Sequence, residues 1–302
     1  MTHAMPTLSE VPRIVAGRYE IGQAVGAGSS GTVFVAVDLE TGERCAIKIR
    51  EARNGERPVR FIAEARDMQR LRHPRLVPVL DYGEDEERYW YTMPLYARGC
   101  LRDRVKRGGP LGPDKALDWI FQVLEGLHAV HEAGLVHRDV KPHNVLVSDD
   151  DHALLADFGL ARHVHGGVDY RTRTDQSMGT PNYRAPEQAT DAASVDARAD
   201  IYGVGATLYF LVTAKRPGFL CMVDRDDPVM ATVPEPLRDF ILKCMALDPA
   251  NRYPNARSCA VDVAALADHY ASDAPVGAAW MKRLDAMSKQ GWLDRIWSWM
   301  RG

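Results

Sequence analysis

Hydrophobic and polar residues alternate through the first part of the chain. The alternation covers Tyr19–Val25, Thr32–Asp38 and Arg44–Arg50, with glycines between the first two runs and a polar turn at 40–43 before the third. Successive side chains of a strand point to opposite faces of a sheet, so this period of two predicts strands with one buried face. The short turns between the runs predict an antiparallel meander.

The pattern then changes from strands to helices. Residues Arg60–Leu71 have apolar positions every three to four residues and end before a proline, which predicts a helix. Strand-like runs follow at Leu76–Tyr82 and Arg88–Met93, and from about residue 97 the period is helical. The later predicted helices are 116–133, 200–214, 235–246 and 256–270. Strands followed by helices predict an α+β chain with two unequal lobes.

These changes of pattern also predict the domain boundaries. We expect an N-terminal extension over 1–17, one domain over 18–270 and a tail over 271–302. Within the domain, the N-lobe covers about 18–94, the hinge 94–98 and the C-lobe 99–270.

Composition and charge exclude several classes of protein. The chain has 302 residues, of which 46% are hydrophobic, and this balance predicts a folded globular protein. Its net charge of −3 lacks the basic excess that a general nucleic-acid binder needs. The five cysteines form no C-x-x-C pair, which predicts reduced thiols. A secretory signal is not visible, and the longest apolar run, 201–214, is too short to span a bilayer, so we expect a cytoplasmic protein.

The first candidate for chemistry is a glycine loop. Gly26, Gly28 and Gly31 form a G-x-G-x-x-G motif. This spacing suits the dinucleotide turn of a nicotinamide oxidoreductase, a hairpin that covers phosphates, or a plain glycine turn. A dinucleotide turn must open a helix, whereas residues 32–37 are β-branched and strand-like. The pattern therefore favours the hairpin.

A second candidate group is a cation on a strand. Ala46 and Lys48 are two residues apart in a predicted strand, so their side chains share one face. A small residue and a cation on one surface suit the base and phosphates of a nucleotide. Glu64, on the predicted helix that follows, is placed to pair with Lys48. Without these neighbours, a strand lysine is usually a solvated edge residue.

The segment from His137 to Gly159 is the most specific of the three candidates for chemistry. If residues 145–147 and 153–156 form a hairpin, Asn144 begins one strand and Asp157 ends its partner, so their side-chain oxygens lie side by side. Hard cations such as Mg²⁺ prefer oxygen ligands of this kind. Asp139 is placed to take or orient a hydroxyl proton, and Lys141 can neutralise a phosphoryl group.

Taken in order, these segments resemble the protein kinase family. The resemblance runs from about Tyr19 to Leu266 and includes H-R-D-x-K-x-x-N at 137–144, D-F-G at 157–159 and A-P-E at 185–187. Lys141 and the Gly179-Thr180 pair resemble the serine/threonine branch, and the run 179–189 is most similar to bacterial eukaryotic-like (Hanks-type) kinases. The resemblance implies a bilobal fold and transfer of the γ-phosphoryl group of ATP to protein hydroxyls, with Mg²⁺, or Mn²⁺ in its place.

The resemblance also implies roles for individual residues. The implied nucleotide contacts are Val25, Gly26, Gly28, Gly31, Val33, Ala46, Lys48, Met93, Pro94, Tyr96, Leu146 and Asp157. Asn144 and Asp157 are implied to hold the metal. The implied catalytic residues are Lys48, Glu64, Asp139, Lys141, Asn144 and Thr180, and the implied structural residues are Arg138, Phe158, Glu187, Asp200 and Arg252, with Arg252 as the partner of Glu187.

Regulation and partners follow from the same resemblance. A buried arginine at Arg138 needs an anion, so we expect phosphorylation of the loop between Gly159 and Gly179, first at Thr174, then Thr172, with Ser177 as a third site. The expected partners are proteins with serine or threonine acceptors, and a second copy of the chain in a homodimer for trans-autophosphorylation. A pseudokinase scaffold is the alternative, and it would be favoured by loss of Lys48, Asp139, Asn144 or Asp157, all of which are present.

The tail has a composition of its own. Residues 276–302 contain four of the six tryptophans and five basic against two acidic residues. Apolar residues at helical spacing on both sides of Gly291 predict two amphipathic pieces. Three alternatives remain open: packing on the helical lobe, docking on a partner, or peripheral contact with a membrane surface.

Overall fold

The computed structural model describes two compact units. The described residues are 13–28, 31–52, 59–85, 88–157, 162–163, 181–190, 195–271 and 275–288. Within them, the first unit comprises the described residues of 13–73 and 77–97, and the second comprises 74–76 and those from 98 onward. The division after Ala97 lies inside the predicted 94–98 segment.

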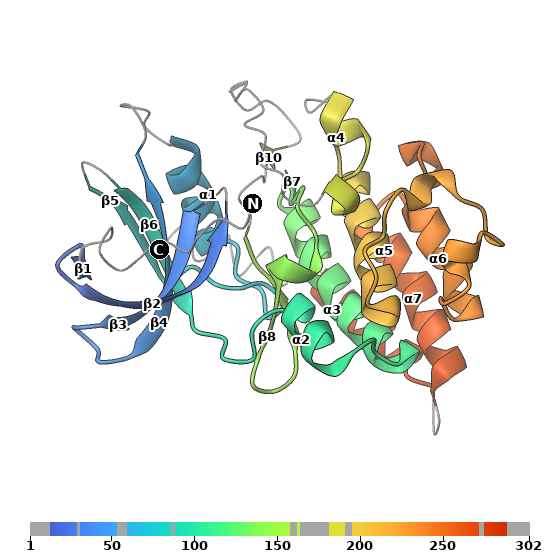
Figure 1. The fold of residues 1–302 in the computed structure, drawn as a ribbon, viewed down its shortest axis with the longest axis horizontal. Coiled ribbons are helices and arrows are strands. Elements are labelled where there is room, and N and C mark those ends of the chain that lie inside the picture. The colour runs from blue at the N-terminus through green and yellow to red at the C-terminus, as the bar shows by residue number, and fades with distance from the viewer. Residues whose placement is uncertain are drawn as a thin grey trace. The chain divides into compact units, whose positions relative to one another are not determined.

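The first unit is built on one antiparallel sheet (Figure 1). The strand order is β1-β2-β3-β4-β6-β5. The bounds are β1 (Ile14–Val15), β2 (Tyr19–Gly28), β3 (Gly31–Asp38), β4 (Arg44–Glu51), β5 (Asp81–Glu84) and β6 (Arg88–Pro94), with the helix α1 (Val59–Arg70) between β4 and β5. The predicted meander and the helix after it are therefore confirmed.

The two faces of this sheet carry different residues, as the alternation predicts. One face buries an apolar core that includes Phe34, Ile47, Ile49 and Trp90. On α1, the ring of Phe61 lies 5.3 Å from that of Tyr91. Since Tyr91 is the neighbour of Trp90 in β6, it points to the opposite face of the sheet, where α1 packs.

Two features of this unit differ from the sequence prediction. Residues Ile14–Val15, at the end of the predicted extension 1–17, pair with β2 as a strand, and Val15 is buried. The predicted strand Leu76–Tyr82 is wrong over most of its length, because β5 begins only at Asp81. Pro78 has no N–H to donate to a ladder. Leu76, Val77 and Val79 are buried without forming a strand, and Leu80 is half exposed.

The second unit is mainly helical. Its helices are α2 (Leu101–Gly108), α3 (Pro113–Glu132), α4 (Glu187–Thr190), α5 (Arg198–Thr213), α6 (Glu235–Cys244), α7 (Ala256–Tyr270) and α8 (Gly277–Ser288). Its strands are β7 (Leu135–Val136), β8 (Val145–Val147), β9 (Ala153–Leu155) and β10 (Arg162–His163). The four later predicted helices are confirmed to within a few residues, and the α+β class is confirmed as well.

The helix α5 lies in the core of this unit. It is buried along almost its whole length, from Ala199 to Val212. Two glycines allow the close approach: a Cβ at Gly203 would lie 2.6 Å from the carbonyl oxygen of Val140, and one at Gly205 would lie 2.5 Å from the Cβ of Cys244. The segment that precedes the β8–β9 hairpin therefore packs directly against the α5 backbone.

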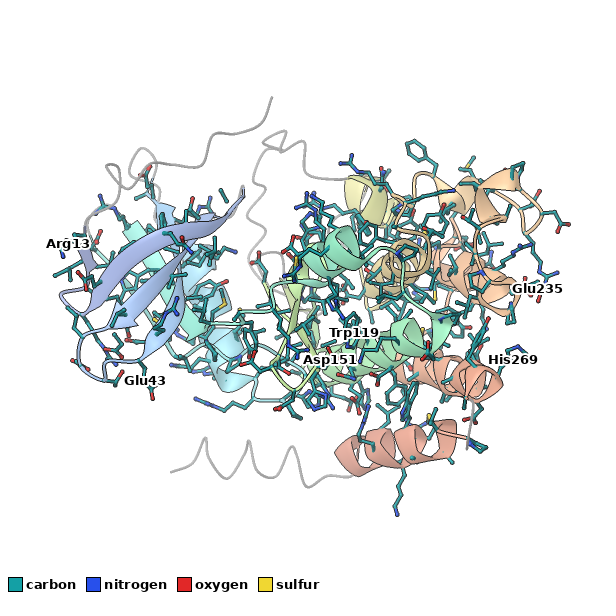
Figure 2. All side chains as sticks on the ribbon, turned by 60° about the horizontal axis from the view of Figure 1, so that its bottom comes forward. Arg13, Glu43, Trp119, Asp151, Glu235 and His269 are labelled. Atoms are coloured by element: carbon teal, nitrogen blue, oxygen red, sulfur yellow. The ribbon has the colours of Figure 1, made fainter. Side chains whose placement is uncertain are left out.

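The β8–β9 hairpin is also fixed to α3. The indole N–H of Trp119 donates to the carbonyl oxygen of Asp151 at 3.0 Å, and the two residues lie together in Figure 2. Lys115 on the same helix forms an ion pair with the carboxylate of Asp151 at 2.6 Å. The turn of the hairpin is thus held by a helix that is itself buried.

The first amphipathic piece of the tail forms α8, which lies beside α7 (Figure 2). Leu284 is fully buried, and the ring of Trp280 lies 4.9 Å from that of Phe121 on α3. For this piece, the packing alternative is correct. The second predicted piece, in 289–302, lies outside the described residues.

Candidate active site

The glycine motif closes the hairpin between β2 and β3. Gly28 pairs with Gly31, and Gly26 pairs with Val33. Gly31 has a φ of +130°, and a Cβ there would lie 2.5 Å from the carbonyl oxygen of Ile49, so only glycine fits. Since the motif leads into a strand and not a helix, the dinucleotide-turn alternative is excluded. Val25 lies at a register shift between β2 and β3 and is half exposed.

Four of the predicted nucleotide contacts share one face of the sheet. Val33 is opposite Lys48 across β3 and β4, while Ala46 is opposite Met93 across β4 and β6. Residues directly opposite each other point to the same face, as do residues two apart, so Val33, Ala46, Lys48 and Met93 form one patch. The strand register therefore brings together residues that are up to 60 positions apart in the sequence.

Lys48 is buried in this patch, with 4% of the residue exposed. Its ammonium lies 5.8 Å from the centre of the Tyr91 ring, within the range of a cation–π contact. The side chain of Glu64 lies outside the described part of the structure, so its pairing with Lys48 stays a prediction. Pro94 ends β6, and Tyr96 is half-buried, which raises the pKa of its phenol.

In the second unit, the loop after β7 gathers three predicted catalytic residues. The carboxylate of Asp139 accepts a hydrogen bond from the ammonium of Lys141 at 2.5 Å and one from the amide of Asn144 at 2.9 Å. Asn144 also donates to the backbone oxygen of Asp139. The guanidinium of Arg184 lies 3.9 Å from the other oxygen of this carboxylate. Asp139 is therefore a fixed carboxylate among cations.

The β8–β9 hairpin connects Asn144 to Asp157. Val145 pairs with Leu155, and the N–H of Ala156 donates to the backbone oxygen of Asn144 at 2.8 Å. Asp157 follows directly and has a φ of +63°, in the left-handed region. The predicted hairpin is confirmed, although β9 ends at Leu155 rather than at residue 156. Leu146, on β8, is half-buried.

The donor atoms of this hairpin suit a hard cation. Both hydrogen bonds from the Asn144 side chain use its nitrogen, so Oδ1 is the atom that can ligate a metal. Together with the carboxylate of Asp157, it offers oxygen ligands of the kind that Mg²⁺ accepts alongside phosphate oxygens and water. Within the described ranges, no group of three or more His, Cys, Asp or Glu residues is placed to hold a metal by itself.

A buried carboxylate fixes the backbone at the start of the loop after β7. Asp200 on α5 accepts hydrogen bonds from the backbone N–H groups of His137 and Arg138, and it contacts the ring of His131 at 2.9 Å. Burial by itself raises the pKa of Asp200, but the bond and charge of His131 and the bond from the His137 amide outweigh it, so the pKa lies below its usual value. His137 in turn contacts the carbonyl oxygen of Ala156 at 3.0 Å.

Sequence reasoning missed two members of this arrangement. His131 is the side-chain partner of Asp200. Gln188 donates to the backbone oxygen of Arg138 at 2.8 Å and accepts from the N–H of Ala185. No local pattern signals either contact, because each joins segments more than 45 residues apart.

The A-P-E segment is joined to the helical core by an ion pair. Both terminal nitrogens of Arg252 donate to the carboxylate of Glu187, at 2.6 and 2.9 Å. The Arg252 side chain is fully buried and also donates to the backbone oxygens of Ala246 and Leu247. This is the pair that the resemblance implies.

The order of these features along the chain matches a known family. The family described as "Protein kinase domain" matches residues 19–262, which is most of the chain. The chain belongs to the protein kinase family. The predicted resemblance and fold class are therefore confirmed.

Several curated relatives of this kinase are similar along most of its length. The serine/threonine-protein kinase PknL of Mycobacterium bovis is 36% identical over 269 residues, which cover 84% of this chain and 67% of PknL. The serine/threonine-protein kinase PknB of Mycolicibacterium smegmatis is 34% identical over 283 residues, 87% of this chain and 45% of PknB. A probable serine/threonine-protein kinase of Clostridium acetobutylicum is 30% identical over 280 residues, 86% of this chain and 41% of that protein. The chain thus spans less than half the length of two of these relatives.

Some predicted residues of the kinase lie outside the described residues. These are Phe158, Thr172, Thr174, Ser177 and Thr180. Their roles stay predictions. Among the helices that the structure does describe, none has the length and apolar character needed to cross a membrane.

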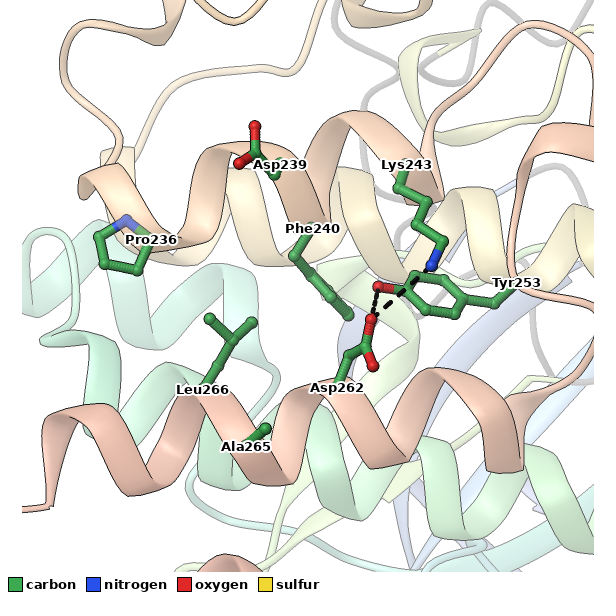
Figure 3. Close-up of a pocket in the computed structure, with 8 residues that line it drawn as sticks. All are labelled: Pro236, Asp239, Phe240, Lys243, Tyr253, Asp262, Ala265 and Leu266. Atoms are coloured by element: carbon green, nitrogen blue, oxygen red, sulfur yellow. Dashed lines mark hydrogen bonds and ion pairs between the residues drawn. The ribbon is translucent and has the colours of Figure 1, made fainter.

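A separate groove of about 360 Å³ lies on the helical unit of the kinase, between α6 and α7 (Figure 3). The hydroxyl of Tyr253 donates to Asp262 at 2.5 Å, and the ammonium of Lys243 lies 3.9 Å from the centre of the Tyr253 ring. The groove is lined by none of the predicted active-site residues.

Proposed function

We propose that this chain is an active serine/threonine protein kinase, which transfers the γ-phosphoryl group of ATP to protein hydroxyls. The observation that carries the proposal is the catalytic loop, where Asp139 is held by Lys141 and Asn144. A fixed carboxylate can accept the proton of a substrate hydroxyl, and the adjacent ammonium can neutralise charge on the transferred group.

In the sheet unit, we assign the nucleotide contacts to the patch described above. Val25, Val33 and Ala46 are the proposed contacts of the adenine ring in this unit, and Leu146 is a further proposed contact. Met93 is the gatekeeper, and the backbone of 94–96 reads the edge of the base. A proline at position 94 still offers the carbonyl that this role needs. The amides of the loop 26–31 cover the phosphates, and Lys48, paired with Glu64, contacts the α- and β-phosphates.

In the helical unit, Asn144 and Asp157 are the proposed ligands of Mg²⁺, or of Mn²⁺ in its place. The cation, when bound, neutralises the charge on the phosphates. Asp139 orients the acceptor hydroxyl and takes its proton, Lys141 stabilises the transferring phosphoryl group, and Thr180 supports the loop at the acceptor. Arg138, Phe158, Glu187, Asp200 and Arg252 maintain this geometry.

A phosphotransfer assay with matched variants tests the activity. We expect the full chain to transfer radiolabelled phosphate from ATP to itself and to a generic protein acceptor, only when Mg²⁺ or Mn²⁺ is present. Lys48→Met, Asp139→Asn and Asp157→Asn should each lower the rate by about two orders of magnitude or more while the proteins stay folded. A wild-type protein that binds ATP but transfers no phosphate would instead indicate a pseudokinase scaffold.

The proposal includes activation by phosphorylation of the loop between 159 and 179. Arg138 is buried, and its guanidinium donates to the backbone oxygen of Val195. A phosphate on Thr174, Thr172 or Ser177 would carry the kind of negative charge that a buried guanidinium binds. We propose trans-autophosphorylation within a transient homodimer as the source. Mass spectrometry of active protein that finds all three residues unmodified would refute this part.

We also propose that residues 289–302 attach the kinase to a partner groove or, peripherally, to the cytoplasmic surface of a membrane. The support is composition, since Trp292, Trp297 and Trp299 are interleaved with basic residues. Co-sedimentation with anionic vesicles, compared between the full chain and a chain ending at Ser288, separates the two. Vesicle binding that is lost on truncation supports attachment to a membrane. If neither protein binds vesicles, docking on a partner protein is favoured.

A further inference from the structure

The tail helix α8 reaches a buried carboxylate on α3. Both the Nε and Nη2 groups of Arg283 donate to Glu125, the latter at 3.0 Å. Glu125 is completely buried, whereas the Arg283 side chain is about one-third exposed. The guanidinium also lies 5.3 Å from the centre of the Phe121 ring, beside Trp280. Arg283 therefore extends from the surface of the helical unit, and its guanidinium pairs with the buried carboxylate of Glu125.

The same carboxylate holds a second arginine from a distant segment. Arg75 donates from its Nε group to Glu125 at 3.2 Å, and its side chain is only 10% exposed. Glu125 is thus the shared acceptor of two guanidinium groups, one from residue 75 and one from α8. Arg283 donates to both carboxylate oxygens, whereas Arg75 donates to Oε2. Removing Arg283 therefore takes away the bond to Oε1 of a buried carboxylate, and the remaining groups must rearrange.

The backbone of Arg75 connects this carboxylate to the β8–β9 hairpin. Its carbonyl oxygen accepts the N–H of Leu155 at 2.9 Å, and the next residue, Leu76, pairs with Leu155 as an isolated bridge. A Cβ at Gly126 would lie 2.9 Å from the same carbonyl oxygen, so this backbone is pressed against α3 beside Glu125. Leu155 ends β9, two residues before Asp157.

We propose that Arg283 is a positioning residue for Asp157. It acts through Glu125 and the backbone of Arg75, which fix the end of β9. The inference rests on the proposed function, because Asp157 matters as a metal ligand only in an active kinase. It assigns to α8, which lies beyond the matched kinase segment 19–262, a part in the geometry of the active site.

Hydrogen exchange measures the first step of this coupling without any activity. In Arg283→Ala, we expect the Leu155 amide of the full chain to exchange about tenfold faster, since the bond to Arg75 opens more often. The amide of Leu208, in the middle of α5, should be unchanged. Arg283→Lys keeps the charge and should restore most of the protection.

The second measurement is the Mg²⁺ dependence of phosphotransfer. We expect the Mg²⁺ concentration for half-maximal rate to rise about tenfold in Arg283→Ala, as for other residues that orient a metal ligand. A residue that only stabilises the fold would not move this concentration in the folded fraction.

Two control variants separate positioning from attachment of α8. Lys282→Ala removes the neighbouring exposed charge, and Arg257→Ala removes the ion pair between α7 and Asp285 on α8. Both should leave Leu155 exchange and the Mg²⁺ dependence within about twofold of wild type. If Arg283→Ala fails to fold, Arg283→Gln takes its place.

The possible outcomes are distinct. Unchanged Leu155 exchange in folded Arg283→Ala or Arg283→Gln, or an equal change in the Arg257 control, would overturn the inference. A wild-type protein without phosphotransfer would refute the proposed function, while the exchange experiment would still decide whether Arg283 fixes β9.

Discussion

The carboxylate of Asp200 accepts the backbone N–H of Arg138 at 2.6 Å, across 62 positions of sequence. Arg138 has a φ of +68°, a left-handed conformation that costs a residue with a side chain about 1–2 kcal/mol. The bond from Asp200, together with the one from the His137 amide, offsets this strain. The backbone that presents Asp139 is therefore held in an unfavourable conformation by a residue of the central helix.

The first prediction concerns this bond. Asn at position 200 would offer one oxygen and turn an NH₂ group toward a buried backbone donor. We expect Asp200→Asn to lower the free energy of unfolding by about 3 kcal/mol, measured by urea denaturation, and phosphotransfer by more than tenfold. Asp196→Asn, which removes a partly exposed pair with Arg198, should change stability by less than about 1 kcal/mol.

This contribution of Asp200 has a defined pH dependence. Because the pKa of Asp200 is lower in the folded protein than its ordinary value of 3.8, its stabilisation is complete at neutral pH and is lost as the pH falls below that value. The stability difference between wild type and Asp200→Asn should therefore shrink below about pH 4. A difference that grows on acidification would contradict the assigned ionisation.

The second prediction concerns the pair of Arg252 and Glu187. Arg252→Met would leave the Glu187 carboxylate and three backbone oxygens without the guanidinium donor. We expect a loss of about 3–5 kcal/mol in the free energy of unfolding. Arg225→Met is the matched control, since it removes exposed pairs with Glu235 and Asp239 and should cost less than about 1 kcal/mol. Equal losses in the two variants would argue against a buried pair.

The third prediction concerns the packing of α8. Leu284 is fully buried, so Leu284→Ala should lower the free energy of unfolding by about 2–5 kcal/mol. Lys282→Ala, on the exposed side of the same helix, should be nearly neutral. Thermal and urea unfolding measure both. A loss below about 0.5 kcal/mol for Leu284→Ala would mean that α8 does not stay docked in solution.

The fourth prediction concerns thiol reactivity. Burial, with the hydrogen bond to Asp103, raises the pKa of Cys100 to about 11, so only about one thiol in a thousand is ionised at pH 8. Cys45, Cys244 and Cys259 are also buried, whereas Cys221 is half-buried. We expect iodoacetamide at pH 8 to modify Cys221 first, as read by peptide mass spectrometry. Rapid modification of Cys100 at this pH would contradict the raised pKa of its thiol.

Much of this kinase could be predicted from local sequence patterns. The strands β2, β3 and β4 and the helices α1 and α7 follow from periodicity, because alternation and helical spacing depend only on neighbouring residues. The order of short motifs was enough to indicate the family, since each motif keeps its chemistry within a few positions. The hairpin that connects Asn144 to Asp157 was also predictable, because both of its strands lie within 15 residues.

Tertiary structure alone decided the supports behind these motifs. Asp200 meets Arg138 and His131, Gln188 meets Arg138, and Glu125 joins Arg75 to Arg283 across 50 and 158 positions. Such pairs leave no periodic trace, because a buried charge is paired by whatever segment the fold brings to it. The apolar run at 76–80 shows the same limit. Its hydrophobic residues predict a strand, but β5 begins only at Asp81. A strand needs backbone donors and acceptors that meet those of a partner strand, and Pro78 lacks the N–H donor.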